Sequence, residues 1–172
     1  MFFLSLIVNA ASIDIDTSYD EAIAIDGNVQ VKIEEMAEFL GEKYDSEERL
    51  KQVGLAGANL PHSDLGDVFP LLERVEINNK IEVIFVGLEE MSRFSKVKAG
   101  QKEKGLCTLG NINEAEAEVT KIKDIYQDTK VKSLEAVPLR EEIILLTDYS
   151  MLSLGIGLLY DVRKYFLACA EF

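Results

Sequence analysis

Histidine and cysteine are scarce in this chain of 172 residues, and their scarcity excludes several kinds of site. The single histidine, His62, rules out metal sites built from several histidines, and a Ser-His-Asp triad would have to use it. The two cysteines, Cys107 and Cys169, lie far apart without the Cys-x-x-Cys spacing of zinc and redox motifs. Their number and spacing exclude a disulfide framework and indicate a reducing compartment, so we expect a cytoplasmic protein.

Long apolar runs and familiar catalytic motifs are absent as well. The run 151–160 is about half as long as the roughly 20 residues needed to cross a bilayer, so we expect no membrane span. The run 2–8 is preceded by no lysine or arginine, which favours a buried first strand over a signal peptide. The sequence also lacks Gly-x-Ser-x-Gly, a Walker-type Gly-Lys-Ser/Thr and Gly-x-Gly-x-x-Gly, so it carries no signature of a hydrolase, a P-loop or a dinucleotide site.

Positive charge is limited, because 18 lysines and arginines stand against 31 acidic residues and leave a net charge of -13. Such a chain repels nucleic-acid phosphates and anionic membranes, so we expect another protein as the partner and not nucleic acid. Segment 92–105 is the exception, because basic residues dominate it. We interpret it as a basic loop in which Lys96, Lys98 and Lys102 are candidates to contact phosphate groups or an acidic partner. A solvated surface loop without a ligand is the alternative.

Strand and helix patterns are mixed along the chain, as in an α/β or α+β protein. The clearest hairpin signal is Asp26-Gly27-Asn28, which stands between alternating apolar residues in 23–33. The clearest central strand is 80–88, which is apolar on both faces. Other expected elements are a helical arm at 34–54, a helix that begins near Asp67, helices at 112–128 and 150–170, and strands at 131–137 and 142–147. We therefore expect one domain over 1–172, with a mixed sheet of about five or six strands, an N-terminal antiparallel meander and helices packed on the sheet.

Several acids lie where the expected strands end. Asp14 and Asp16 occupy one face of an expected strand with Ile13 and Ile15, Glu89 follows the central strand, and Asp148 follows the apolar run 143–146. Carboxylate oxygens suit hard cations, and open α/β sheets bind ligands at the carboxyl ends of their strands. We therefore predict a Mg²⁺ or Mn²⁺ site with these four acids as candidate ligands. Because the chain has 31 acidic residues, solvated loop carboxylates are the alternative.

The N-terminal residues also resemble a known superfamily. Ile13-Asp14-Ile15-Asp16-Thr17-Ser18, followed by Ala22-Ile23-Ala24-Ile25-Asp26-Gly27, is similar to the first hairpin of ribonuclease H-like and actin-like proteins. The resemblance implies that Asp14 is a metal-binding catalytic acid, with Glu89 or Glu90 as a second acid and Asp148 as a last one. Asp16 stands where actin-like ATPases have glycine, and a carboxylate there would repel phosphate. The resemblance therefore favours the nuclease type over the ATPase type.

Two functions of different classes follow from these patterns. The first is a small acidic binding or regulatory protein that acts through protein-protein contacts, with its acidic surface or the helical arm at 34–54 holding the partner. The alternative is a metal-dependent phosphoryl-transfer enzyme of ribonuclease H-like type, with Asp14 and Asp148 as catalytic acids and Asp16 as a further ligand. A cluster of these carboxylates around one point would favour the enzyme, so their arrangement in space decides between the two.

Overall fold

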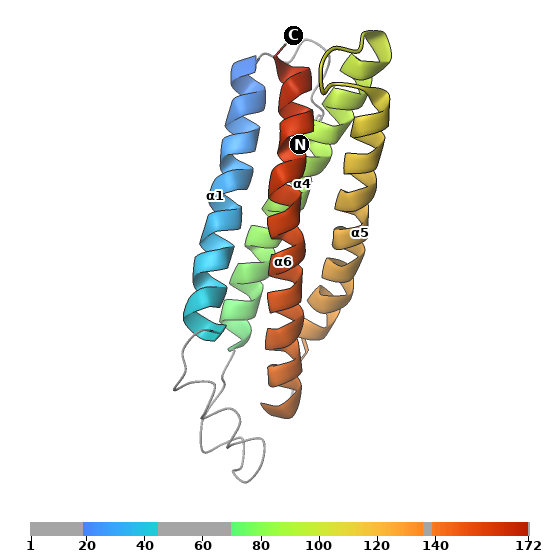
Figure 1. Ribbon diagram of the computed structural model, residues 1–172. Coiled ribbons are helices and arrows are strands. Elements are labelled where there is room, and N and C mark those ends of the chain that lie inside the picture. The colour runs from blue at the N-terminus through green and yellow to red at the C-terminus, as the bar shows by residue number, and fades with distance from the viewer. Residues whose placement is uncertain (1–18, 45–69, 136–138, 172) are drawn as a thin grey trace, which may run out of the picture.

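The computed structural model describes residues 19–44, 70–135 and 139–171, and these residues form a bundle of four helices (Figure 1). The helices are α1 (Tyr19–Tyr44), α4 (Leu71–Gln101), α5 (Leu109–Ser133) and α6 (Leu139–Ala170). α1 and α5 each pack against both α4 and α6, and α4 also contacts α6 across the middle of the bundle. Neighbouring helices around the bundle run in opposite directions, and α6 is the front helix in Figure 1.

The predicted α/β or α+β fold with a mixed sheet is wrong. The described residues contain no strand, and their one β-type pairing is an isolated bridge between Lys104 and Cys107. Segment 80–88, the expected central strand, lies inside α4. A short apolar run fits a buried strand and a buried helix equally well by periodicity. The helix forms here because the buried positions continue at spacings of three and four beyond both ends of the run, at Ile77, Ile81, Ile84, Phe85, Leu88 and Met91.

The predicted hairpin is wrong as well, because residues 23–33 are helical within α1. Asp26-Gly27-Asn28 therefore lies in the middle of a helix and not in a turn. The Asp26 side chain is buried and accepts hydrogen bonds from Arg163 of α6, at 2.5 Å from Nε and 2.6 Å from Nη2. This contact satisfies the carboxylate inside the bundle. The antiparallel meander implied by the ribonuclease H-like resemblance is not formed over these residues.

The remaining secondary-structure predictions have mixed outcomes. Helices at 112–128 and 150–170 are confirmed, as parts of the longer α5 and α6. The predicted strand at 142–147 is wrong, because it lies in α6, and the predicted strand at 131–137 begins in the last turn of α5. The helix expected near Asp67 is present as α4, which begins at Leu71 directly after Pro70, while Asp67 itself lies outside the described residues.

The predicted basic loop and helical arm also differ from the structure. Residues 92–101 of the segment 92–105 form the last turns of α4, so its Lys96 and Lys98 stand on a helix. Residues 34–44 of the arm form the second half of α1, and 45–54 lie outside the described residues. The expected first strand at 2–8 and the loop around His62 also lie outside them.

The connection from α4 to α5 carries a disulfide. Cys107 is bonded to Cys169 near the end of α6, with their Cα atoms 4.9 Å apart. Reciprocal backbone hydrogen bonds between Lys104 and Cys107 tighten this connection, and Gly105 supplies the positive φ of 56° that its turn requires. The Thr108 hydroxyl then caps α5 by accepting a hydrogen bond from the Asn111 backbone at 3.1 Å. The two cysteines are therefore bonded to each other, a pairing that their number and spacing did not indicate.

A buried polar network fixes how α4, α5 and α6 meet. The Tyr149 hydroxyl donates to Asn78 Oδ1 at 2.6 Å, and Asn78 Nδ2 donates to Ser133 Oγ at 2.7 Å. Arg74 donates to the carbonyl oxygen of Ser133 at 3.0 Å, at the end of α5 where a cation also favours the helix dipole. Burial raises the pKa of Tyr149 to about 12, so its hydroxyl keeps the proton that it donates. Because each group has a partner, the network stabilises one register of the three helices.

Gly87 sets the close approach of α1 to α4. A Cβ added at Gly87 would collide with Cγ2 of Val29 on α1, whereas one added at Gly100 near the end of α4 meets nothing within 4 Å. We expect Gly87→Ala to lower the free energy of unfolding by about 1–3 kcal/mol through overpacking. Gly100→Ala is the matched control and should raise it by about 1 kcal/mol, since alanine favours the helix. Urea denaturation followed by circular dichroism measures both, and equal effects would contradict this packing.

Candidate functional site

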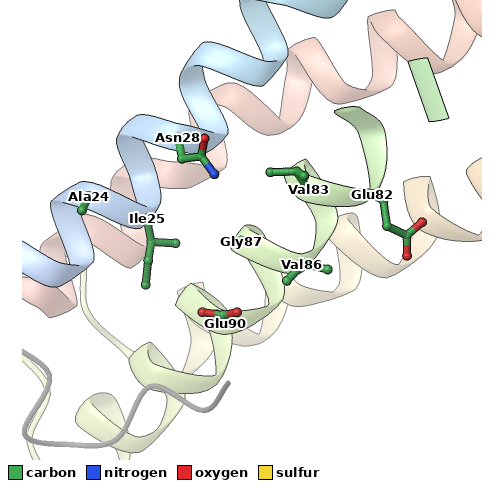
Figure 2. Close-up of a pocket in the computed structure, with 8 residues that line it drawn as sticks. All are labelled: Ala24, Ile25, Asn28, Glu82, Val83, Val86, Gly87 and Glu90. Carbon is green, nitrogen blue, oxygen red and sulfur yellow. The ribbon is translucent and has the colours of Figure 1, made fainter. Parts of the chain in front are cut away.

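A groove with a largely apolar surface lies between α1 and α4 (Figure 2). Its volume is about 400 Å³. Its lining residues are Ala24, Ile25 and Asn28 of α1 and Glu82, Val83, Val86, Gly87 and Glu90 of α4. Figure 2 shows the α1 side chains across a gap from those of α4, while the Glu82 side chain points away from α1.

The groove follows from the spacing of small and branched residues on the two helices. The lining residues of α4 recur at intervals of three and four, so they stand on one side of that helix. Gly87 lets Val29 approach the α4 backbone beneath the groove, and Val86 beside it stays 47% exposed. Ile25 is partly buried against the core from the α1 side. The floor of the groove is therefore closely packed, and Ile25 and Val86 belong to its apolar walls.

Glu90 places a partly buried carboxyl group in the groove. Partial burial raises the pKa of the Glu90 carboxyl, and the nearby charge of Arg93 opposes this shift. Within the described residues no donor makes a hydrogen bond to this carboxylate. Glu82, by contrast, accepts a hydrogen bond from the Tyr126 hydroxyl at 2.7 Å and lies 3.4 Å from Lys130 Nζ. The Tyr126 hydroxyl is the first cause of the lowered pKa of Glu82. Of the two groove carboxylates, Glu90 is thus the one without a described hydrogen-bond donor, and Arg93 is the cation near it.

The raised pKa of Glu90 makes stability depend on pH in a definite direction. Between its ordinary value of 4.5 and its higher folded value, the folded chain binds the proton more tightly than the unfolded chain. The tighter proton binding of the folded chain favours folding below pH 4.5. This stabilisation is lost as the pH rises from 4.5 through the folded pKa of Glu90. We expect Glu90→Gln to be modestly more stable than the natural chain at neutral pH, and the difference to vanish below pH 4.5. Urea titrations at a series of pH values measure this, and a difference that grows toward acid pH would contradict it.

The structure separates the candidate metal ligands that it describes. Glu89 on α4 accepts hydrogen bonds from Lys123 Nζ at 3.0 and 2.9 Å, and Asp148 on α6 accepts one from Lys132 Nζ at 2.7 Å. Each carboxylate is therefore paired with a lysine of α5. In the described part of the chain, no three His, Cys, Asp or Glu side chains come together as a metal site would require. Asp14 and Asp16 lie outside that part, so their role as ligands stays a prediction.

The three lysines predicted to contact phosphate groups or an acidic partner have different surroundings. Lys96 Nζ lies 2.6 Å from Glu116 of α5, and that pair lowers the pKa of the Glu116 carboxyl. The Lys98 ammonium lies over the Phe94 ring, 5.6 Å from its centroid. Lys102 is the C-cap residue of α4 and is exposed. Their separate surroundings favour helix-surface roles, and contact with an acidic partner stays a prediction.

The α1/α4 groove is absent from the sequence-based predictions. The expected strands at 23–33 and 80–88 assigned its residues to a sheet, and periodicity alone does not show which two helices become neighbours. The usable signal is the uncharged run from Val83 to Leu88, which contains one glycine and lies between Glu82 and the acids Glu89 and Glu90.

Comparison with known proteins does not assign a function. The chain matches no protein-family model, no curated protein and no solved structure. Among the described helices, none combines the length and the apolar character that crossing a membrane requires.

Proposed function

We propose that this is a binding protein whose α1/α4 groove takes an amphipathic helix from another protein, with a basic side chain of that helix paired to Glu90. The observation that carries the proposal is a partly buried carboxylate, without a hydrogen-bond donor among the described residues, at the edge of an apolar groove. A lysine or arginine of the partner would neutralise this carboxylate. The attraction between the two charges would be stronger where the contact excludes water.

Shape and charge both support a helical, basic partner. A groove between two helices accepts the apolar face of a third helix through side chains spaced three and four residues apart. The net charge of -13 attracts a basic partner over a longer range and raises its rate of association. This proposal keeps the binding function expected from composition and places it on α1 and α4.

A designed peptide of leucine and lysine in amphipathic helical order tests the proposal directly. We expect it to bind the full chain in titration calorimetry, and a leucine-glutamate peptide of the same pattern to bind much more weakly. Val86→Arg should weaken binding by about 10-fold, since a cation in the groove opposes a basic ligand. Val97→Arg is the matched control, because Val97 has the same 47% exposure on α4 and does not line the groove.

The outcomes of this titration are decisive for the groove. Equal weakening by Val86→Arg and Val97→Arg would show a general charge effect and contradict binding in the groove. Glu90→Gln should also weaken the leucine-lysine peptide, and unchanged affinity would contradict the role of that carboxylate.

The compartment is part of the same proposal. The cytoplasmic expectation rests on the number and spacing of the cysteines, but Cys107 and Cys169 are bonded to each other. Structural disulfides persist in oxidising compartments, so we propose that the protein works in one. Alkylation of protein freshly taken from its source, followed by mass spectrometry, should find both cysteines unmodified until a reductant is added. Alkylation without a reductant would contradict this assignment.

A further inference from the structure

The outward face of α6 is apolar over the middle of the helix. Residues 149–160 contain no charged side chain. Met151 is 65% exposed, and Leu154 and Leu158 are each 73% exposed. A helix that is apolar all round is ordinarily covered on every side, yet no described helix crosses in front of α6 in Figure 1. α6 therefore has a face whose composition is that of a contact surface.

The exposed residues are arranged as a packing seam. Ile144, Met151, Leu154 and Leu158 follow one another at intervals of seven, three and four residues, which is the spacing of a helix that packs along another helix. Gly157 beside them is exposed, and a Cβ added there would meet nothing within 4 Å. Gly155 differs, because a Cβ added there would lie only 2.9 Å from the Ile122 side chain of α5. The space at Gly157 lets a second backbone come close to the seam.

We propose that α6 forms a homodimer by packing antiparallel against α6 of a second copy, centred near Leu154. A second copy fits because the chain is strongly acidic, and residues 149–160 let two such chains meet over a stretch that carries no charge. The seam is also complementary to itself, since antiparallel packing sets Met151 of one copy opposite Leu158 of the other. Parallel packing would hold the two Asp161 side chains, one turn beyond Leu158, against each other, whereas antiparallel packing sets each Asp161 level with Asp148, which Lys132 Nζ already pairs at 2.7 Å.

The size of the seam sets the expected strength of the dimer. The central part of the seam, from Met151 to Leu158, extends for about 11 Å along the helix. An interface of this length buries less than the roughly 800 Å² per partner of a standard interface, so the dimer should be weak and dependent on concentration. We expect a dissociation constant in the micromolar range.

Sedimentation velocity of the full, oxidised chain over a series of concentrations tests the dimer. We expect a shift from monomer to dimer as concentration rises, and Leu154→Glu should raise the dissociation constant by about 30-fold or more. Leu72→Glu is the matched control, because Leu72 is 79% exposed on α4 and the same change there should leave the dimer unaltered. A natural chain that stays monomeric at several hundred micromolar overturns the proposal, as does a dimer that Leu154→Glu leaves intact.

The direction of packing has its own test. Met151→Cys and Leu158→Cys variants are mixed and oxidised, after circular dichroism has confirmed that each is folded. Antiparallel packing predicts faster cross-linking between the two different variants than between two copies of Met151→Cys. Faster cross-linking of Met151→Cys with itself overturns the antiparallel arrangement. The natural disulfide stays intact in both variants and serves as an internal reference for oxidation.

Discussion

Removal of the Cys107–Cys169 disulfide should lower the free energy of unfolding by about 4 kcal/mol, the value that chain entropy gives for a loop closed by residues 62 apart. The bond ties the connection between α4 and α5 to the end of α6, so without it the unfolded chain gains freedom and α6 loses an anchor. A domain of this size is stable by about 5–15 kcal/mol in total, so the loss is a large fraction of the whole.

Two measurements check this expectation. Urea denaturation of the Cys107→Ser, Cys169→Ser double variant should show the lower midpoint, and the natural chain with excess dithiothreitol should show a similar one. The double variant itself should be insensitive to dithiothreitol. A natural chain whose midpoint does not move under full reduction would contradict a stabilising bond.

Asp26→Ala should destabilise the fold by about 3–5 kcal/mol, because it leaves the Arg163 guanidinium buried without its carboxylate. The two side chains are only 9% and 10% exposed. The hydrogen bond to Asp26 is the first cause of the raised pKa of Arg163, so this cation stays charged and cannot escape the cost by losing a proton. Gln30 Oε1 at 3.3 Å is a weaker substitute for the lost acceptor.

The control for Asp26 is an exposed ion pair. Lys96 and Glu116 are 2.6 Å apart, but their side chains are 44% and 42% exposed. Glu116→Ala should therefore cost no more than about 1 kcal/mol. An Asp26→Leu, Arg163→Met double variant should recover most of the stability lost in Asp26→Ala, since it removes both buried charges. A similar small loss in Asp26→Ala and Glu116→Ala would show that the pair is not buried in solution.

The residues around Asp26 show why the first half of the chain is predicted as a sheet. Asp26-Gly27-Asn28 is among the strongest local turn signals, and the alternation of isoleucine and valine around it suits strands. Those residues nevertheless continue α1, where Arg163 satisfies Asp26. Arg163 lies 137 positions away, so no local pattern reveals this contact. Segment 80–88 is wrongly predicted as a strand for a related reason. A run that is apolar on two faces fits a buried helix as well as a buried strand.

The grouping of the predicted site acids depends on the same expected sheet. Glu89 and Asp148 were placed together because both follow apolar runs, which would end at one edge of a parallel sheet. In the bundle those runs lie within helices, and each acid meets a lysine of α5. The acids of the groove, Glu82 and Glu90, became distinct from the other 29 acidic residues only when the neighbours of each were known.

The sequence by itself determined the acidic character of this protein and the helices at 112–128 and 150–170, because charge is a sum over residues and amphipathic periodicity is local. Only the tertiary structure decided that Cys107 meets Cys169, that Asp26 meets Arg163, and that α1 and α4 enclose a groove. Each of these depends on contacts between different helices. Such contacts are selected by the packing of the whole bundle, and periodicity within one segment does not encode them.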